Sequence, residues 1–145
     1  MTQEDKELLL QDLCSRLPYG VKCIVTKSRT EEGQKGDIGK IVCVCLEGVD
    51  CIGDEPFFSE FGNFKPYLFP ISSMTEEQKK FFKDRPIFLD SENELVVKED
   101  FFGNSRFTML DDWMEVINWC YENHFDINGL IPKKLAINCI NLNIY

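Results

Sequence analysis

The chain has a single histidine, His124, among its 145 residues. It has no glycine-rich loop followed by Lys and Ser or Thr, which excludes the phosphate-binding loop of nucleotide-hydrolysing proteins. Paired Cys-x-x-Cys motifs, typical of structural zinc sites, are also missing, although there are seven cysteines. No apolar run approaches the roughly 20 residues that a membrane-spanning helix needs. The sequence therefore has no signature of catalysis, of a cofactor or of a membrane span.

The charge of the chain is one-sided. There are 25 Asp and Glu against 16 Lys and Arg, which gives a net charge of −9. Such a field repels a phosphate backbone, so direct binding of nucleic acid is not expected. Residues 47–60 and 111–126 contain acids but no Lys or Arg, whereas residues 21–40 are mildly basic. The acidic stretches are either solvated faces or a surface that attracts a cationic partner or imitates a nucleic-acid backbone.

The compartment is indicated by the N-terminus and the cysteines. The chain begins with acids where a secretory signal needs a basic region, and its apolar run is only Leu8–Leu10. An odd number of scattered cysteines suits a reducing compartment better than a disulfide framework. We therefore expect a cytoplasmic protein. With no linker and no internal repeat, a single domain over residues 1–145 is expected.

The first third of the chain predicts one helix and a small sheet. Thr2 and Asp5 form a capping-box pattern, and Pro18 and Gly20 end the helix that follows. Strands are predicted over residues 21–27, 38–46 and 49–52. Together they predict a small antiparallel sheet, open or curled into a barrel-like form.

The remaining elements are mainly helical. Thr75 with Gln78 forms a second capping box, which opens a short helix. Residues 87–89 and 94–98 flank a turn and predict a hairpin. Thr108 with Asp111 forms a third capping box and starts the longest helix.

That last helix has the clearest amphipathic pattern in the chain. We predict that its apolar face closes the core. The expected fold class is α+β, a small antiparallel sheet packed against the N-terminal helix and this long C-terminal helix. The apolar stripe comprises Leu110, Trp113, Met114, Ile117 and Tyr121, and adjoining it are Val116, Cys120 and His124.

The cysteines and the histidine are the candidates for chemistry. Cys43 and Cys45 should share one strand face, with Cys51 and Cys23 within reach, and four thiolates can hold zinc. Buried cysteine more often acts as a small hydrophobe, so we predict core packing, no metal and no other cofactor. A catalytic His124 would need a nucleophile from another element, so we predict a helix-end residue favoured by the helix dipole. No catalytic residue is assigned.

Residues 56–70 are rich in aromatic side chains. Three prolines and a glycine exclude a regular helix there, so a connector is predicted. The aromatic rings either seal the underside of the sheet or remain exposed, beside acids, as a partner-binding patch. The candidate partner-binding residues are Phe57, Phe58, Phe61, Phe64, Glu55 and Glu60.

Three segments of the chain, residues 5–21, 64–77 and 124–132, carry a resemblance. They include the sequences Arg16-Leu17-Pro18-Tyr19-Gly20, Lys65-Pro66-Tyr67-Leu68 and Gly129-Leu130-Ile131-Pro132. Together they resemble a family of uncharacterised short proteins from gut Bacteroidales bacteria and their phages and prophages. The resemblance implies a bacterial or phage cytoplasm and implies no activity.

The function expected from the sequence is that of a small protein-binding or regulatory module of mobile-element origin, not of an enzyme. One alternative is a small hydrolase or metal-dependent enzyme built around His124 or the cysteines. Another is an acidic decoy that imitates nucleic acid. The sequence gives no indication of the oligomeric state.

Overall fold

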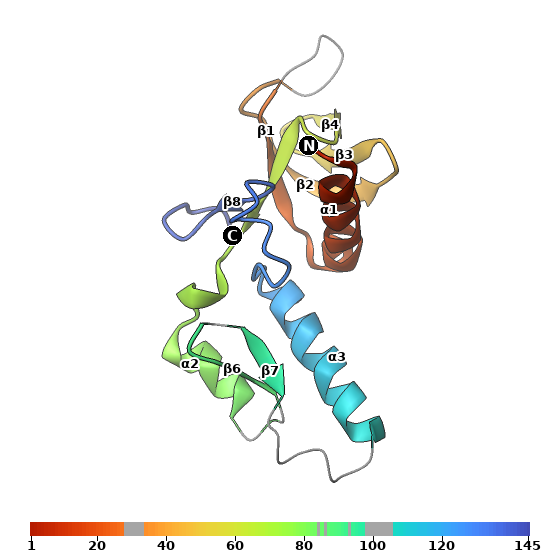
Figure 1. Ribbon diagram of the computed structural model, residues 1–145. Coiled ribbons are helices and arrows are strands. Elements are labelled where there is room, and N and C mark those ends of the chain that lie inside the picture. The colour runs from red at the N-terminus through yellow and green to blue at the C-terminus, as the bar shows by residue number, and fades with distance from the viewer. Residues whose placement is uncertain (28–33, 84, 86, 93, 98–105) are drawn as a thin grey trace.

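The computed structural model describes residues 1–27, 34–83, 85, 87–92, 94–97 and 106–145. These residues form an α+β fold, as predicted, with the helix α1 packed on a mainly antiparallel sheet (Figure 1). The six described strands of this sheet are ordered β4-β3-β2-β1-β5-β8, and only the edge pair β5 and β8 is parallel. The sheet is open rather than closed into a barrel.

The helix α1 spans Gln3–Arg16, and its predicted capping box is confirmed. The Thr2 hydroxyl accepts the Asp5 N–H at 3.1 Å, and the Asp5 carboxylate accepts the Thr2 N–H at 3.1 Å. A short 3₁₀ turn, Leu17–Tyr19, follows, and Gly20 then adopts a left-handed φ of 72°. Pro and Gly therefore end the helix as the sequence predicts.

In the main sheet, β1 to β4 are neighbours in chain order, whereas β5 and then β8 lie on the other side of β1. Residues 56–70, predicted to be a connector, in fact contain β4 and β5. Proline lacks a backbone N–H, so a strand tolerates it where no neighbouring strand needs that donor. Pro56 begins an edge strand, and β8 pairs with β5 only beyond Pro66, so neither proline removes a hydrogen bond of the sheet. The prolines exclude a helix but permit these strands. The bounds are β1 Lys22–Val25, β2 Ile38–Val44, β3 Gly48–Ile52, β4 Pro56–Glu60, β5 Phe64–Leu68 and β8 Ile137–Asn138.

The remaining elements form a helical side next to the sheet (Figure 1). The Thr75–Gln78 capping box and the hairpin are confirmed. The helix α3 begins at Arg106, so Thr108 lies inside it and the prediction that Thr108 caps it is wrong. The elements are α2 Glu76–Lys79, a 3₁₀ turn Lys80–Phe82, β6 Ile87–Leu89, β7 Leu95–Val97 and α3 Arg106–Glu122.

Two clusters of buried residues correspond to these two sides. The sheet cluster lies between α1 and the sheet and includes Leu9, Leu13, Ile41, Phe64 and Leu68. The helix cluster lies between the 3₁₀ turn Lys80–Phe82, β6 and α3 and includes Met74, Phe82, Ile87, Val116 and Cys120. In the part of the chain that the structure describes, no helix is long and apolar enough to cross a membrane.

Candidate functional site

The six residues predicted to bind a partner do not form one surface. Phe57 packs against the sheet cluster, and the rings of Phe61 and Phe64 make a tilted contact with their centroids 5.7 Å apart. Phe64 is only 2% exposed and belongs to the core, so its side chain is not available to a partner. Phe58 neighbours Phe57 on β4 and therefore points to the opposite face of the sheet.

The two acids of that set also lie apart. Glu55 is exposed in the turn before β4, and Glu60 is half-buried at the end of the same strand. Phe58 lies opposite Asp50 of β3. Of the predicted set, only Glu55 is exposed, and Phe58 is half-buried on the face of β4 opposite to Phe57.

The four cysteines considered as a zinc site divide into a buried pair and a more accessible pair. Cys23 and Cys51 are buried, with their Sγ atoms 3.3 Å apart, and Gly39 between them has no side chain to obstruct the contact. This hydrogen bond and burial raise the pKa of Cys23. Core packing is therefore confirmed for this pair.

Core packing is wrong for Cys43, which is exposed, while Cys45 is half-buried. A register shift between Ile41 and Cys43, a β-bulge, interrupts the alternation of β2 and turns Cys43 to the outer face. Among the described residues, no three His, Cys, Asp or Glu side chains are arranged to hold a metal ion.

His124 follows the C-terminus of α3 and has a left-handed φ of 58°. Its ring is 9% exposed and stacks on Tyr145 with the ring centroids 3.9 Å apart. Burial, and then the positive charges of Arg16 and Lys22, lower its pKa to about 4. The imidazole is therefore neutral at pH 7. The predicted position at the end of the helix is confirmed, but a neutral ring gains little from the helix dipole.

The same burial affects the nearest candidate nucleophile on α3. Burial raises the pKa of Cys120 to about 12, so its thiol stays protonated at neutral pH. An imidazole with a pKa near 4 is a weak base for removing that proton. The arrangement of His124 and Cys120 therefore gives no support to nucleophilic catalysis.

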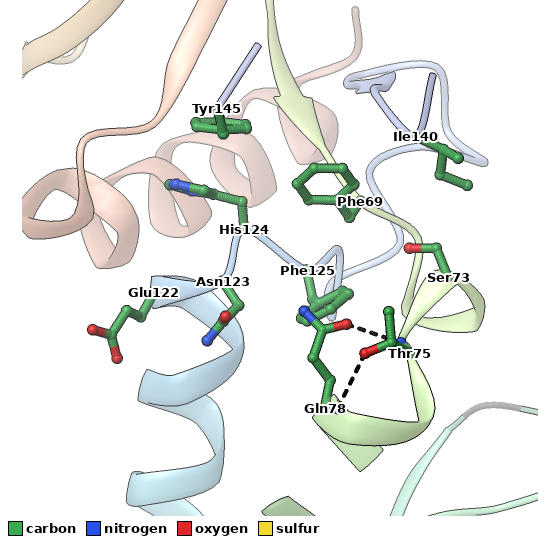
Figure 2. A pocket seen from close by; sticks show the side chains of 10 residues that line it. All are labelled: Phe69, Ser73, Thr75, Gln78, Glu122, Asn123, His124, Phe125, Ile140 and Tyr145. Carbon is green, nitrogen blue, oxygen red and sulfur yellow. Dashed lines mark hydrogen bonds between the residues drawn. The ribbon is translucent and has the colours of Figure 1, made fainter. Parts of the chain in front are cut away.

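A pocket of about 510 Å³ lies beside His124 and Tyr145 (Figure 2). On its opposite wall, the side chains of Thr75 and Gln78 are occupied by their own capping box. The Ser73 hydroxyl donates to the Pro70 carbonyl at 2.7 Å. The side chains of Ser73, Thr75 and Gln78 thus hold local structure.

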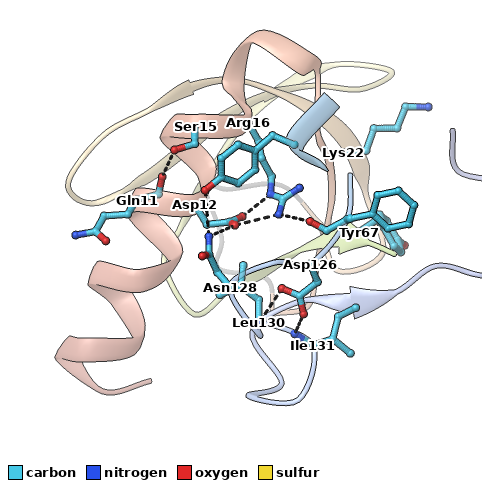
Figure 3. Close-up of polar contacts among 12 residues, drawn as sticks. Gln11, Asp12, Ser15, Arg16, Lys22, Tyr67, Asp126, Asn128, Leu130 and Ile131 are labelled. Carbon is cyan, nitrogen blue, oxygen red and sulfur yellow. Dashed lines mark hydrogen bonds and ion pairs between the residues drawn. The ribbon is translucent and has the colours of Figure 1, made fainter. Parts of the chain in front are cut away.

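A buried polar network joins the two sides of the molecule (Figure 3). Arg16 Nε donates to Asp12 Oδ2 at 2.6 Å, and both side chains are fully buried. Arg16 Nη2 donates to the Phe125 carbonyl at 2.7 Å, and Asn128 Nδ2 donates to Asp12 Oδ1 at 2.8 Å. The guanidinium also lies 4.8 Å from the centre of the Tyr121 ring. These contacts connect α1 to the end of α3 and to the loop beyond it.

The most unusual surface is on α3. The predicted apolar face is buried only in part: Leu110 is 62% exposed and Met114 52% exposed, whereas Trp113 packs against the helix cluster and the adjoining Val116 and Cys120 are completely buried. The prediction that this stripe closes the core is therefore wrong at Leu110 and Met114.

Leu110 and Met114 stay exposed because a different side of α3, the one that carries Trp119, packs against the helix cluster. Trp119 stacks on Phe81 with the ring centroids 4.5 Å apart, and it also contacts Phe82 and Phe125 edge-on or stacked. Large aromatic rings bury more area than Leu or Met, so this contact sets which side of α3 faces the cluster. Leu110 and Met114, on the other side of α3, are left exposed to solvent.

Beside the open stripe lies a groove of about 760 Å³, here called the α3 groove. Trp113 and Ile117, both half-buried, form its wall on α3. The opposite side comes from the β6–β7 hairpin and from residues 126–132, including Leu95, Ile127, Glu92 and Glu94. The groove and the neighbouring Leu110 and Met114 form the candidate binding surface.

The α3 stripe was predicted as part of the core, not as a binding surface. The stripe on α3 and the absence of Lys and Arg from residues 111–126 were visible in the sequence. Leu95, Ile127 and Glu92 were not assigned to a site, because only the tertiary fold brings the hairpin and the loop next to α3.

The comparisons with known proteins supply no relative for this chain. No protein-family model matches it, and neither the curated proteins nor the solved structures contain a match.

Proposed function

We propose that this protein is a small cytoplasmic protein-binding module whose contact surface is the α3 groove together with Leu110 and Met114. The observation that carries the proposal is the exposure of these two side chains, 62% and 52%, on the stripe with the best helical periodicity. Exposed apolar surface next to a groove is typical of a site that another protein covers. The occupant would be an apolar segment of a partner protein.

The energy available on this surface is appreciable. Complete burial of a Leu or Met side chain contributes about 1.5–3 kcal/mol. Since Leu110 and Met114 are each more than half exposed, covering both would contribute about 2–3 kcal/mol. Trp113, half-buried in the groove wall, is of the residue type most enriched among residues that dominate binding.

The cytoplasmic part of the proposal is supported by the cysteines, which are all free thiols. The acidic stretch of α3 gives less support to a decoy of nucleic acid. Arg85 already pairs with Glu115 at 2.7 Å and lies 3.9 Å from Asp112, so part of that charge is neutralised within the molecule.

Site-specific photo-crosslinking tests the proposal. A benzophenone amino acid would replace Met114 in one variant and Gln11, which is exposed on α1, in a control, in the cells that naturally express the protein. We expect an adduct with one other protein from position 114, much weaker from position 11, and lost when Leu110→Lys is added. Equal labelling from both positions, or an adduct that consists of two copies of this chain, would contradict it.

A further inference from the structure

We infer that the α3 groove selects a cationic segment of its partner, in which Lys or Arg side chains alternate with aliphatic ones. This inference rests on the proposed function and adds the chemistry of the occupant. It is carried by two carboxylates that form no ion pair with any described residue, and by one aromatic ring, all of which line the same groove.

The carboxylates are those of Glu92 and Glu94, both exposed at the turn of the β6–β7 hairpin. Their backbone N–H groups both donate to Asp90 Oδ1, at 2.8 and 2.9 Å, so Asp90 holds the backbone of both residues. Neither carboxylate forms an ion pair within the described part of the chain. The third acid of the groove, Asp126, is already used, because it accepts the N–H groups of Leu130 and Ile131.

No described residue that lines the groove is Lys or Arg. Arg85, which does not line the groove, donates two hydrogen bonds to Glu115, at 2.8 and 2.7 Å. That pairing lowers the pKa of Glu115 and leaves Arg85 little capacity to neutralise the groove. Complementary charge on a partner would be attracted by the uncompensated field.

Trp113 is the aromatic ring in the groove wall. Elsewhere the molecule supplies its own cations to aromatic rings, with Arg85 over Phe81 at 4.2 Å and Lys6 over Phe61 at 5.5 Å. In the described ranges Trp113 has no such cation. Tryptophan has the most favourable ring for this contact, so a Lys or Arg that pairs with Glu92 or Glu94 could also lie over its face.

The test uses synthetic peptides and the full-length protein. One peptide alternates leucine with lysine along its sequence, and its control has glutamate in place of every lysine. Isothermal titration calorimetry measures their affinities at low and at high salt. We expect the leucine–lysine peptide to bind, more weakly at high salt, and the leucine–glutamate peptide to bind at least tenfold less tightly.

The location is tested by charge reversal. Glu92→Lys with Glu94→Lys should weaken the leucine–lysine peptide about tenfold or more. The matched control, Glu47→Lys with Glu55→Lys, makes the same change in net charge at exposed sites on the sheet side and should change the affinity about twofold or less. Trp113→Leu should weaken binding about threefold. Circular dichroism checks the fold of each variant. If the lysine pair at positions 92 and 94 unfolds the protein, Glu92→Gln with Glu94→Gln takes its place.

The outcomes separate the two proposals. If both charge-reversal variants bound the leucine–lysine peptide equally weakly, the effect would come from the net charge of the protein and not from the groove. That result would overturn the inference. Equal binding of the two peptides would overturn the charge selectivity and leave the docking surface intact. Failure of the crosslink at position 114 would instead remove the proposed function itself.

Discussion

The sheet side and the helical side bury their apolar residues according to different rules. A strand directs its side chains to only two faces, so alternation along the sequence decides which residues are buried. In β1, Cys23 and Val25 are buried, while Ile24 between them is half-buried. The helix α3 offers a continuous range of directions and carries two apolar arcs. Its neighbours reach the arc of Trp119, and the more regular arc of Leu110 stays open. Periodicity thus identifies an amphipathic helix without identifying the face that is covered.

The largest expected effect concerns the contact that holds the two sides together. Asp12→Ala leaves the fully buried guanidinium of Arg16 without its counter-ion. Breaking a buried ion pair by removing one partner lowers the free energy of unfolding by about 3–5 kcal/mol. Urea denaturation followed by circular dichroism measures the change.

The matched variant is Asp12→Leu with Arg16→Met, which removes both charges and retains apolar volume. Such replacements are often neutral or stabilising, so the double variant should be more stable than Asp12→Ala. A single Asp12→Ala variant that unfolds at the same urea concentration as the wild type would show that the two clusters do not depend on this pair.

The second prediction uses His124, which lies where the two sides meet. Its folded pKa is about 4, below the ordinary 6.5, so the unfolded chain takes up the proton first as the pH falls. Its contribution to stability is therefore present above pH 6.5 and is lost as the pH falls towards 4. The loss should be about 2 kcal/mol once solvent screening is included.

Chemical denaturation at a series of pH values measures this loss, with His124→Asn as the control. Asn tolerates the left-handed backbone at this position and does not titrate. The difference in stability between the two proteins should shrink or reverse as the pH falls from 6.5 to 4. Parallel pH profiles would show that the imidazole is hydrated in the folded state.

Local signals predicted the local elements well. The capping boxes at Thr2 and Thr75 are confirmed, because a side chain and a backbone group three residues apart are sufficient to form them. The hairpin of β6 and β7 is also confirmed, because its two strands are close together in the sequence. The α+β class followed from these elements together.

The errors arose where distant residues decide the outcome. Pro56 and Pro66 become compatible with strands only because one lies on an edge and the other lies where β8 is absent. The bulge that exposes Cys43 depends on the pairing of β2 with β3. The α3 groove likewise requires Leu95 and Ile127 to meet α3, and no spacing in the sequence states that contact.

The smallest expected effect is the sharpest test of the contrast between the two arcs of α3. Leu110→Gln and Met114→Gln should each change the free energy of unfolding by less than about 0.5 kcal/mol, since both side chains are mostly in solvent. Val116→Ala, on the buried arc, should lower it by about 2 kcal/mol, because two methyl groups leave a closed cluster. Thermal and urea unfolding of the three variants measure the difference. If Leu110→Gln destabilised the protein as much as Val116→Ala, the stripe would belong to the core of the folded chain, and the surface proposed for a partner would already be occupied from within.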